Sequence, residues 1–88
     1  MKNYTKIIHR ALLDWLDENG WDTKYSSVSM VEEGVYRAIA YHVSEKREYI
    51  CITFEQFDLE NMLGYIGMCN SDLPRLIRAE IDNRRKRR

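Results

Sequence analysis

The sequence predicts a single α+β domain in which an N-terminal helix and two C-terminal helices cover one face of a three-stranded antiparallel sheet. Two observations lead to this fold class. Apolar residues recur with a period near 3.6 over residues 4–19, with a period of about 2 over residues 22–54, and with the longer period again after residue 55. The candidate strands are joined by short turns, which favours antiparallel pairing. A chain of 88 residues is long enough for one such domain.

The first helix is expected over residues 4–19, and its end is marked by Asn19 and Gly20. Gly20 can adopt the left-handed conformation that ends many helices, and Trp21 should then fold back toward Leu16. The stripe expected to face the core consists of apolar residues at three- and four-residue steps: Tyr4, Ile7, Ile8, Ala11, Leu12, Trp15 and Leu16.

Three strands are expected over residues 23–31, 35–43 and 48–54, with the first at the edge because serines interrupt it. Gly34 allows a positive φ in the first turn, and residues 44–47 form the second. Alternation assigns a large aliphatic face to the helix side of the sheet. The opposite face, expected to remain open, is small, aromatic and polar: Tyr36, Ala38, Ala40, His42, Tyr49, Cys51 and Thr53.

Two further helices follow the strands. The first is expected over residues 55–68 with Asp58 as its N-cap. The second begins near Ser71, which is the candidate N-cap, and has Pro74 in its first turn, where a missing N–H is tolerated.

Charge is distributed unevenly, although 14 basic residues balance 14 acidic ones. Residues 1–83, the expected compact domain, hold nine basic and 14 acidic side chains, for a net charge of −5. The remaining residues follow the last apolar position and are expected to form a basic tail, either a solvated extension or a frayed final turn of the last helix: Arg84, Arg85, Lys86, Arg87 and Arg88. Such a run could bind nucleic-acid phosphates, an acidic protein surface or anionic lipid, or serve only solubility.

The α-β-β-β-α order resembles that of double-stranded-RNA-binding domains, which grip phosphates with a lysine cluster at the start of the final helix. Here the helix starts carry acidic residues instead: Glu55, Asp58, Glu60 and Asp72. Because their charge has the wrong sign for that contact, the resemblance covers only the order of elements. If nucleic acid is bound, the basic tail is the candidate contact.

The acidic body is a second candidate site, because residues 11–74 carry a net charge of −8. A surface of this kind can imitate nucleic-acid phosphates or dock on a basic groove of another protein. Ordinary solvated faces and charges that favour helix N-termini are the structural alternative. One cluster surrounds the end of the first helix: Asp14, Asp17, Glu18 and Asp22. The carboxylates chosen as candidate partner contacts are Glu32, Glu33, Glu55, Asp58 and Glu60.

The open sheet face is a third candidate, because tyrosines combine an apolar ring with a polar tip and are common at interfaces. A partner, or a second copy of the chain in a homodimer, could cover this face. Its candidate contacts are Tyr25, Tyr36, His42 and Tyr49.

No motif for catalysis, a cofactor or a metal is present. The sequence has no Gly-rich phosphate loop, no nucleophile elbow and no metal-ligand spacing among its two cysteines and two histidines. Alternation places His42 and Cys51 on one face as a thiol–imidazole pair, but no third group is in place to orient it. We therefore expect no enzyme activity, no cofactor and no metal.

We interpret the sequence as a small cytoplasmic binding protein, because no apolar run is long enough for a membrane span. Its compact, tyrosine-rich and acidic character is similar to that of inhibitors from phages and mobile elements, including anti-CRISPR and other counter-defence proteins. The hypothesis is that the acidic body blocks a protein partner that binds nucleic acid. The alternative is a nucleic-acid-binding or transcriptional regulatory protein that contacts phosphates with residues 84–88.

Overall fold

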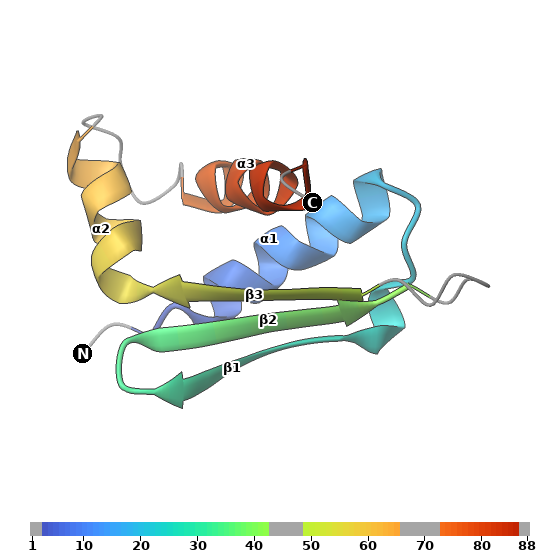
Figure 1. Ribbon diagram of the computed structural model, residues 1–88, viewed down its shortest axis with the longest axis horizontal. Helices are drawn as coiled ribbons and strands as arrows, with labels where there is room; N and C mark the ends of the chain where they lie inside the picture. Colours follow the sequence, from blue (N-terminus) through green and yellow to red (C-terminus); the bar gives the residue numbers. More distant parts are fainter. Residues whose placement is uncertain (1–2, 43–48, 66–72, 87–88) are drawn as a thin grey trace.

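The computed structural model describes residues 3–42, 49–65 and 73–86, and it confirms the expected order of elements (Figure 1). The second turn, the Ser71 cap and the end of the 55–68 helix beyond Tyr65 lie outside the described residues. The elements are α1 (Thr5–Glu18), the short 3-10 helix η1 (Thr23–Tyr25), β1 (Ser26–Glu32), β2 (Val35–Tyr41), β3 (Tyr49–Glu55), α2 (Gln56–Tyr65) and α3 (Leu73–Lys86).

The end of α1 has the geometry that the sequence predicts. Gly20 adopts a φ of +75°. The Trp21 N–H donates to the Leu16 carbonyl at 2.8 Å, and the Gly20 N–H donates to the Asp17 carbonyl at 3.4 Å. This pair of bonds satisfies carbonyls that the helix end would otherwise leave without partners. It also folds Trp21 back into the core, where its ring packs edge-to-face on Trp15 with 5.8 Å between centroids.

The sheet is antiparallel with the order β1-β2-β3, so β1 is an edge strand as expected. Glu33 and Gly34 alone connect β1 to β2, and Gly34 has the expected positive φ of +75°. The first strand begins later than predicted, at Ser26, because Thr23–Tyr25 form a 3-10 turn. The Asp22 side chain caps that turn by accepting from the Lys24 N–H at 2.9 Å.

The expected assignment of the sheet faces is wrong for β2. Directly opposite residues of an antiparallel pair share a face, and Tyr36 lies opposite Phe54. Ala38 and Ala40 likewise lie opposite Ile52 and Ile50, and all six side chains are buried beneath the helices. Side chains alternate between the two faces of each strand, as expected. Alternation does not say which face of β2 lies on the same side of the sheet as the apolar face of β3. That choice is made by the pairing register.

The helices all lie on one side of the sheet, as predicted (Figure 1). α1 contacts β1, β2 and α3, while α2 contacts β3. Small side chains at Ala38 and Ala40 leave room for the large residues of α1. Pro74 lies in the first turn of α3, as expected. The core is completed by apolar residues of the three helices, including Ile8, Leu12, Leu16, Leu59, Leu73, Ile77 and Ile81.

Candidate functional site

Three of the candidate carboxylates line one hollow at the end of the sheet where β3 joins α2. Glu33 comes from the β1–β2 turn, Glu55 from the last position of β3, and Glu60 from α2. The turn is held against the helix start because the Gln56 N–H donates to the Gly34 carbonyl at 2.8 Å. The hollow has a volume of about 340 Å³. Residues 27 positions apart in the sequence are thus brought to one surface.

Phe57 is the most exposed large apolar residue of the described chain, and it lies on the wall of this hollow. It belongs to the first turn of α2 and is 70% exposed, whereas Leu59, two residues later, is fully buried. An exposed aromatic ring next to several carboxylates has the composition of a binding patch, with an apolar centre and a charged rim.

Glu60 differs from its neighbours because its carboxylate is already bonded within the protein. It accepts from the Tyr4 hydroxyl at 3.3 Å and from the Gln56 side-chain amide at 3.0 Å. By contrast, Glu33 and Glu55 have no ion-pair partner within residues 3–42, 49–65 and 73–86. Glu33 and Glu55 are therefore the better contacts for a cationic partner.

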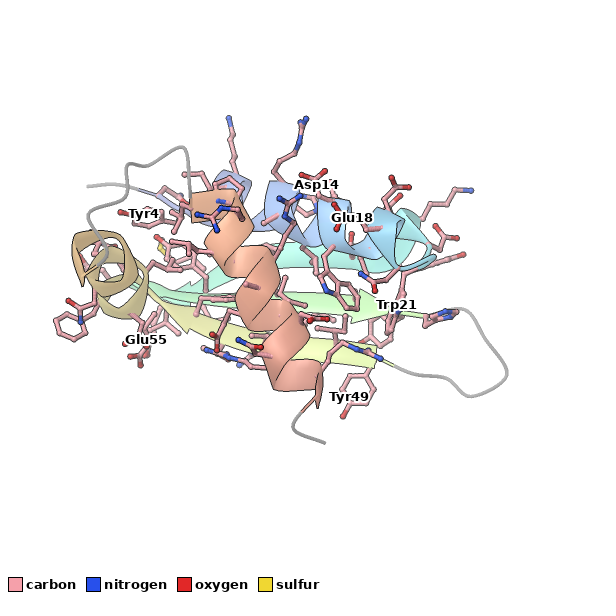
Figure 2. All side chains as sticks on the ribbon, turned by 90° about the horizontal axis from the view of Figure 1, so that it is seen from above. Tyr4, Asp14, Glu18, Trp21, Tyr49 and Glu55 are labelled. Carbon is pink, nitrogen blue, oxygen red and sulfur yellow. The ribbon has the colours of Figure 1, made fainter. Side chains whose placement is uncertain are left out.

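Glu32 and Asp58 are exposed and lie on segments at the same end of the molecule. Asp58 is not the N-cap that the sequence predicted. It lies inside the first turn, because α2 begins at Gln56, immediately after β3. We call the surface formed by Glu32, Glu33, Glu55, Asp58, Glu60 and Phe57 the acidic end. Figure 2 shows Glu55 beside the start of α2, with Tyr49 at the other end of β3.

The bond between Tyr4 and Glu60 has a consequence for stability at high pH. Burial of the Tyr4 ring raises the pKa of its phenol above 10.0, and the negative charge of Glu60 raises it further. The folded state therefore holds the phenol proton more tightly than the unfolded state does. This contribution to stability is fully present below pH 10 and is lost as the pH rises toward the higher folded pKa.

The Tyr4→Phe variant should lack this pH-dependent contribution. We expect the difference in Tm between the wild-type protein and Tyr4→Phe to be constant up to about pH 9 and to shrink as the pH rises beyond about 10. Thermal unfolding followed by circular dichroism across this range measures the difference. Tyr41→Phe, at an exposed position, is the control and should show no such trend. A Tyr4→Phe difference that stays constant through pH 11 would contradict the assignment.

The cluster at the end of α1 is a weaker candidate than the acidic end. Asp14 lies 3.9 Å from Arg10, and Glu18 lies 3.3 Å from Arg78, so two of its four carboxylates already face a cation. Exposed pairs of this kind contribute about 0–1 kcal/mol to stability, but they reduce the negative potential available to a partner. Asp14 and Glu18 are labelled in Figure 2.

The candidate contacts on the open sheet face are not brought together. Tyr36 is 0% exposed and cannot reach a partner, which corrects its predicted role. Its hydroxyl accepts from the Tyr4 N–H at 3.2 Å, and its ring packs edge-to-face on Tyr4. Tyr25 is 51% exposed but lies in η1, and Tyr49 is 50% exposed on β3. The tyrosine that pairs with Tyr49 across the open face is Tyr41. Because Tyr41 alternates with Ala40 and His42, the expected face assignment placed it on the covered side of the sheet.

His42 and Cys51 do not form the pair that alternation suggested. His42 is half-buried, and its ring packs on Trp21 with 4.6 Å between centroids. Cys51 is exposed and lies opposite Ile39 on the open face. No group of three metal-ligating side chains occurs within the part of the chain that the structure describes.

The basic tail begins inside helix α3. Helix α3 continues to Lys86, so Arg84 and Arg85 belong to its last turn and are half-buried. Arg84 donates to the Glu80 carboxylate at 2.7 Å and to the Thr53 carbonyl at 2.6 Å, and its guanidinium lies 5.1 Å from the Phe54 ring centroid. Arg85 lies over Trp21 and Trp15, at 4.8 and 5.4 Å. Of the two arrangements expected for the tail, these two residues form a final helical turn and not a solvated extension, because aromatic rings beneath α3 attract their cations.

Sequence reasoning missed Phe57 as a candidate contact. The sequence does carry a signal for its exposure. The apolar stripe expected for this helix follows three- and four-residue steps through Leu59, Met62, Leu63 and Ile66, and Phe57 lies outside it. A large apolar residue outside the stripe of an amphipathic helix has no core position to occupy, so it is expected at the surface.

Comparisons with protein-family models, with curated proteins and with solved structures find no match for this chain. Within the described residues, no helix is long and apolar enough to cross a membrane.

Proposed function

We propose that the protein is a small, non-enzymatic binding protein that places its acidic end on a basic surface of a protein partner. The observation that supports this most is the hollow shared by Glu33, Glu55 and Glu60 with the exposed ring of Phe57 on its wall. The carboxylates would steer the encounter with a cationic surface, and the ring would be buried on contact.

The partner surface that fits this arrangement is the nucleic-acid-binding groove of another protein. Such grooves are lined by lysine and arginine, and carboxylates held on a rigid scaffold can occupy the positions of phosphates. Occupying the groove would block nucleic acid from entering it. This is the mode of action expected of an inhibitor of the phage counter-defence or anti-CRISPR type, which is the class that we propose.

The charge-reversed variant Glu33→Lys/Glu55→Lys tests the proposal, since both side chains line the hollow and form no ion pair with any residue that the structure describes. Glu60 is left unchanged because it bonds to Tyr4 and Gln56. The control, Asp17→Lys/Glu18→Lys, alters net charge equally on the exposed end of α1, and it also removes the exposed Glu18–Arg78 pair, which contributes about 0–1 kcal/mol to stability. We expect wild-type protein and control to capture, from cell extract, a nucleic-acid-binding protein that competing DNA or RNA releases. The association rate of the Glu33→Lys/Glu55→Lys variant with that protein should fall at least about tenfold at low salt.

Two outcomes would contradict this proposal. One is equal binding of the captured protein by both charge-reversed variants. The other is direct binding of DNA or RNA by the chain itself, with an affinity that falls steeply with salt and is lost when residues 86–88 are removed. That second result would favour the alternative of a nucleic-acid-binding regulator.

A further inference from the structure

The free edge of β3 carries backbone groups that point away from the sheet. Among residues 3–42, 49–65 and 73–86, β2 is the only strand that pairs with β3. The Thr53 carbonyl accepts from Arg84 of α3, which shows that it faces the unpaired side. Because backbone groups along a strand alternate between its two sides, Tyr49, Cys51 and Thr53 direct their N–H and C=O groups to the free edge. Ile50 and Ile52 direct theirs to β2.

A groove follows this edge beneath the last turn of α3. Its volume is about 330 Å³, close to that of the hollow at the acidic end. One wall is β3, and the other is formed by the two arginines of the last turn. The lining residues are Tyr49, Ile50, Cys51, Ile52, Thr53, Arg84 and Arg85. The groove thus combines backbone groups that face away from β2 with two guanidinium groups, and both are held in place by the fold.

The two guanidinium groups have defined positions. Arg84 is fixed by Glu80, by the Thr53 carbonyl and by the Phe54 ring. Arg85 is fixed over Trp15 and Trp21. Glu80 balances part of the charge of Arg84, and the next residue in the sequence, Lys86, is also basic. Cations placed beside a strand edge favour a segment that brings carboxylates to them.

We propose that the free edge of β3 accepts an extended, acidic peptide segment of a partner protein as a fourth strand. The peptide backbone would pair with Cys51 and Thr53, and alternate side chains with carboxylates would face Arg84 and Arg85. In the unbound protein the Arg84 guanidinium donates a hydrogen bond to the Thr53 carbonyl. When a peptide N–H donates to that carbonyl in its place, the guanidinium can turn to a peptide carboxylate. This site is separate from the acidic end and does not depend on the proposed function.

Charge argues for an acidic peptide over a second copy of the chain. If two β3 edges paired with each other, each would bring its own Arg84 and Arg85 to the junction, and four guanidinium groups would meet there. Like charges at a strand edge disfavour self-pairing, and natural proteins use them for that purpose. A carboxylate-bearing strand meets no such repulsion.

Amide hydrogen exchange of the full chain, measured residue by residue by NMR, tests the proposal. The probe is a capped hexapeptide of alternating valine and glutamate, and the control peptide has lysine in place of each glutamate. At saturating acidic peptide, exchange at the Cys51 and Thr53 amides should slow at least about tenfold, while exchange at Ile52 should not change. The lysine peptide should leave all three amides unchanged.

The Cys51→Pro variant provides a second test. Proline at this position removes an N–H that faces the free edge without removing a bond to β2, and proline is tolerated on edge strands. We expect the affinity for the acidic peptide to fall at least about tenfold in Cys51→Pro and to change less than about twofold in the matched control Cys51→Thr.

Three results would overturn the proposal. In the first, the acidic peptide fails to bind. In the second, the peptide binds without slowing amide exchange at Cys51 and Thr53, which would indicate that only the charge of the basic tail attracts it. In the third, the chain forms a dimer in solution that Cys51→Pro dissociates, which would identify the occupant as a second copy.

Discussion

Replacing Tyr36 with alanine is expected to lower the free energy of unfolding by about 3–5 kcal/mol, the usual cost of removing a large buried aromatic side chain. The ring of Tyr36 is fully buried, lies opposite Phe54 and packs on Tyr4. A domain of 88 residues has a total stability of about 4–13 kcal/mol, so this loss can unfold a large share of the protein. Urea denaturation followed by circular dichroism measures the change.

Two further variants show how much of this loss of stability comes from the hydrogen bond of Tyr36 and how much depends on the burial of its ring. Tyr36→Phe keeps the ring but leaves the buried Tyr4 N–H without its acceptor, and it should cost about 1–3 kcal/mol. Tyr41→Ala removes a tyrosine from the same strand that is 56% exposed, and it should cost less than about 1 kcal/mol. If Tyr36→Ala and Tyr41→Ala cost the same, the register that buries Tyr36 would be wrong.

Replacing Phe57 with alanine is expected to weaken binding to the protein partner by about 2 kcal/mol, which corresponds to roughly a 30-fold higher Kd. Because the ring is 70% exposed in the unbound protein, the free energy of unfolding should change by no more than about 0.5 kcal/mol. The loss should lie mainly in the dissociation rate, since truncating an apolar contact leaves the long-range charge of the acidic end intact. Surface plasmon resonance with the captured partner measures both rates.

Tyr25→Ala is the control for Phe57→Ala, because it also removes a half-exposed ring but lies in η1, away from the acidic end. We expect its Kd to change less than about twofold. If Tyr25→Ala weakened binding more than Phe57→Ala, the surface around η1 and not the acidic end would be the contact surface. The different kinetic effects of Phe57→Ala and of Glu33→Lys/Glu55→Lys also distinguish an apolar anchor from electrostatic steering.

Features governed by neighbouring residues could be predicted well. The cap of α1 at Gly20 and Trp21 and the turn at Gly34 depend on a few adjacent side chains and on the positive φ that glycine allows. The edge position of β1 followed from its serines. The start of α2 was expected at residue 55 and lies at Gln56, but its contacts could not be predicted in the same way, because the bond from the Gln56 N–H to the Gly34 carbonyl joins segments that are distant in the sequence.

The candidate site was predicted in part. Its carboxylates were chosen from charge alone, and the structure places Glu33, Glu55 and Glu60 around one hollow. Charge does not show that Glu60 is bonded to Tyr4, or that Arg84 and Arg85 lie against aromatic rings. These contacts depend on where α2 and α3 pack, which the hydrophobic period of each helix leaves open.

The sequence alone predicts the order of elements, the packing of all three α-helices on one side of the sheet, and the excess of negative charge over the body. These features are predictable because periodicity and charge are properties of local sequence. The roles of Tyr36, Phe57 and Arg84 were decided by the tertiary structure. A strand presents two chemically similar faces, and only its register with the next strand selects which one is buried. In β2 the register places Tyr36 in the core and Tyr41 on the surface.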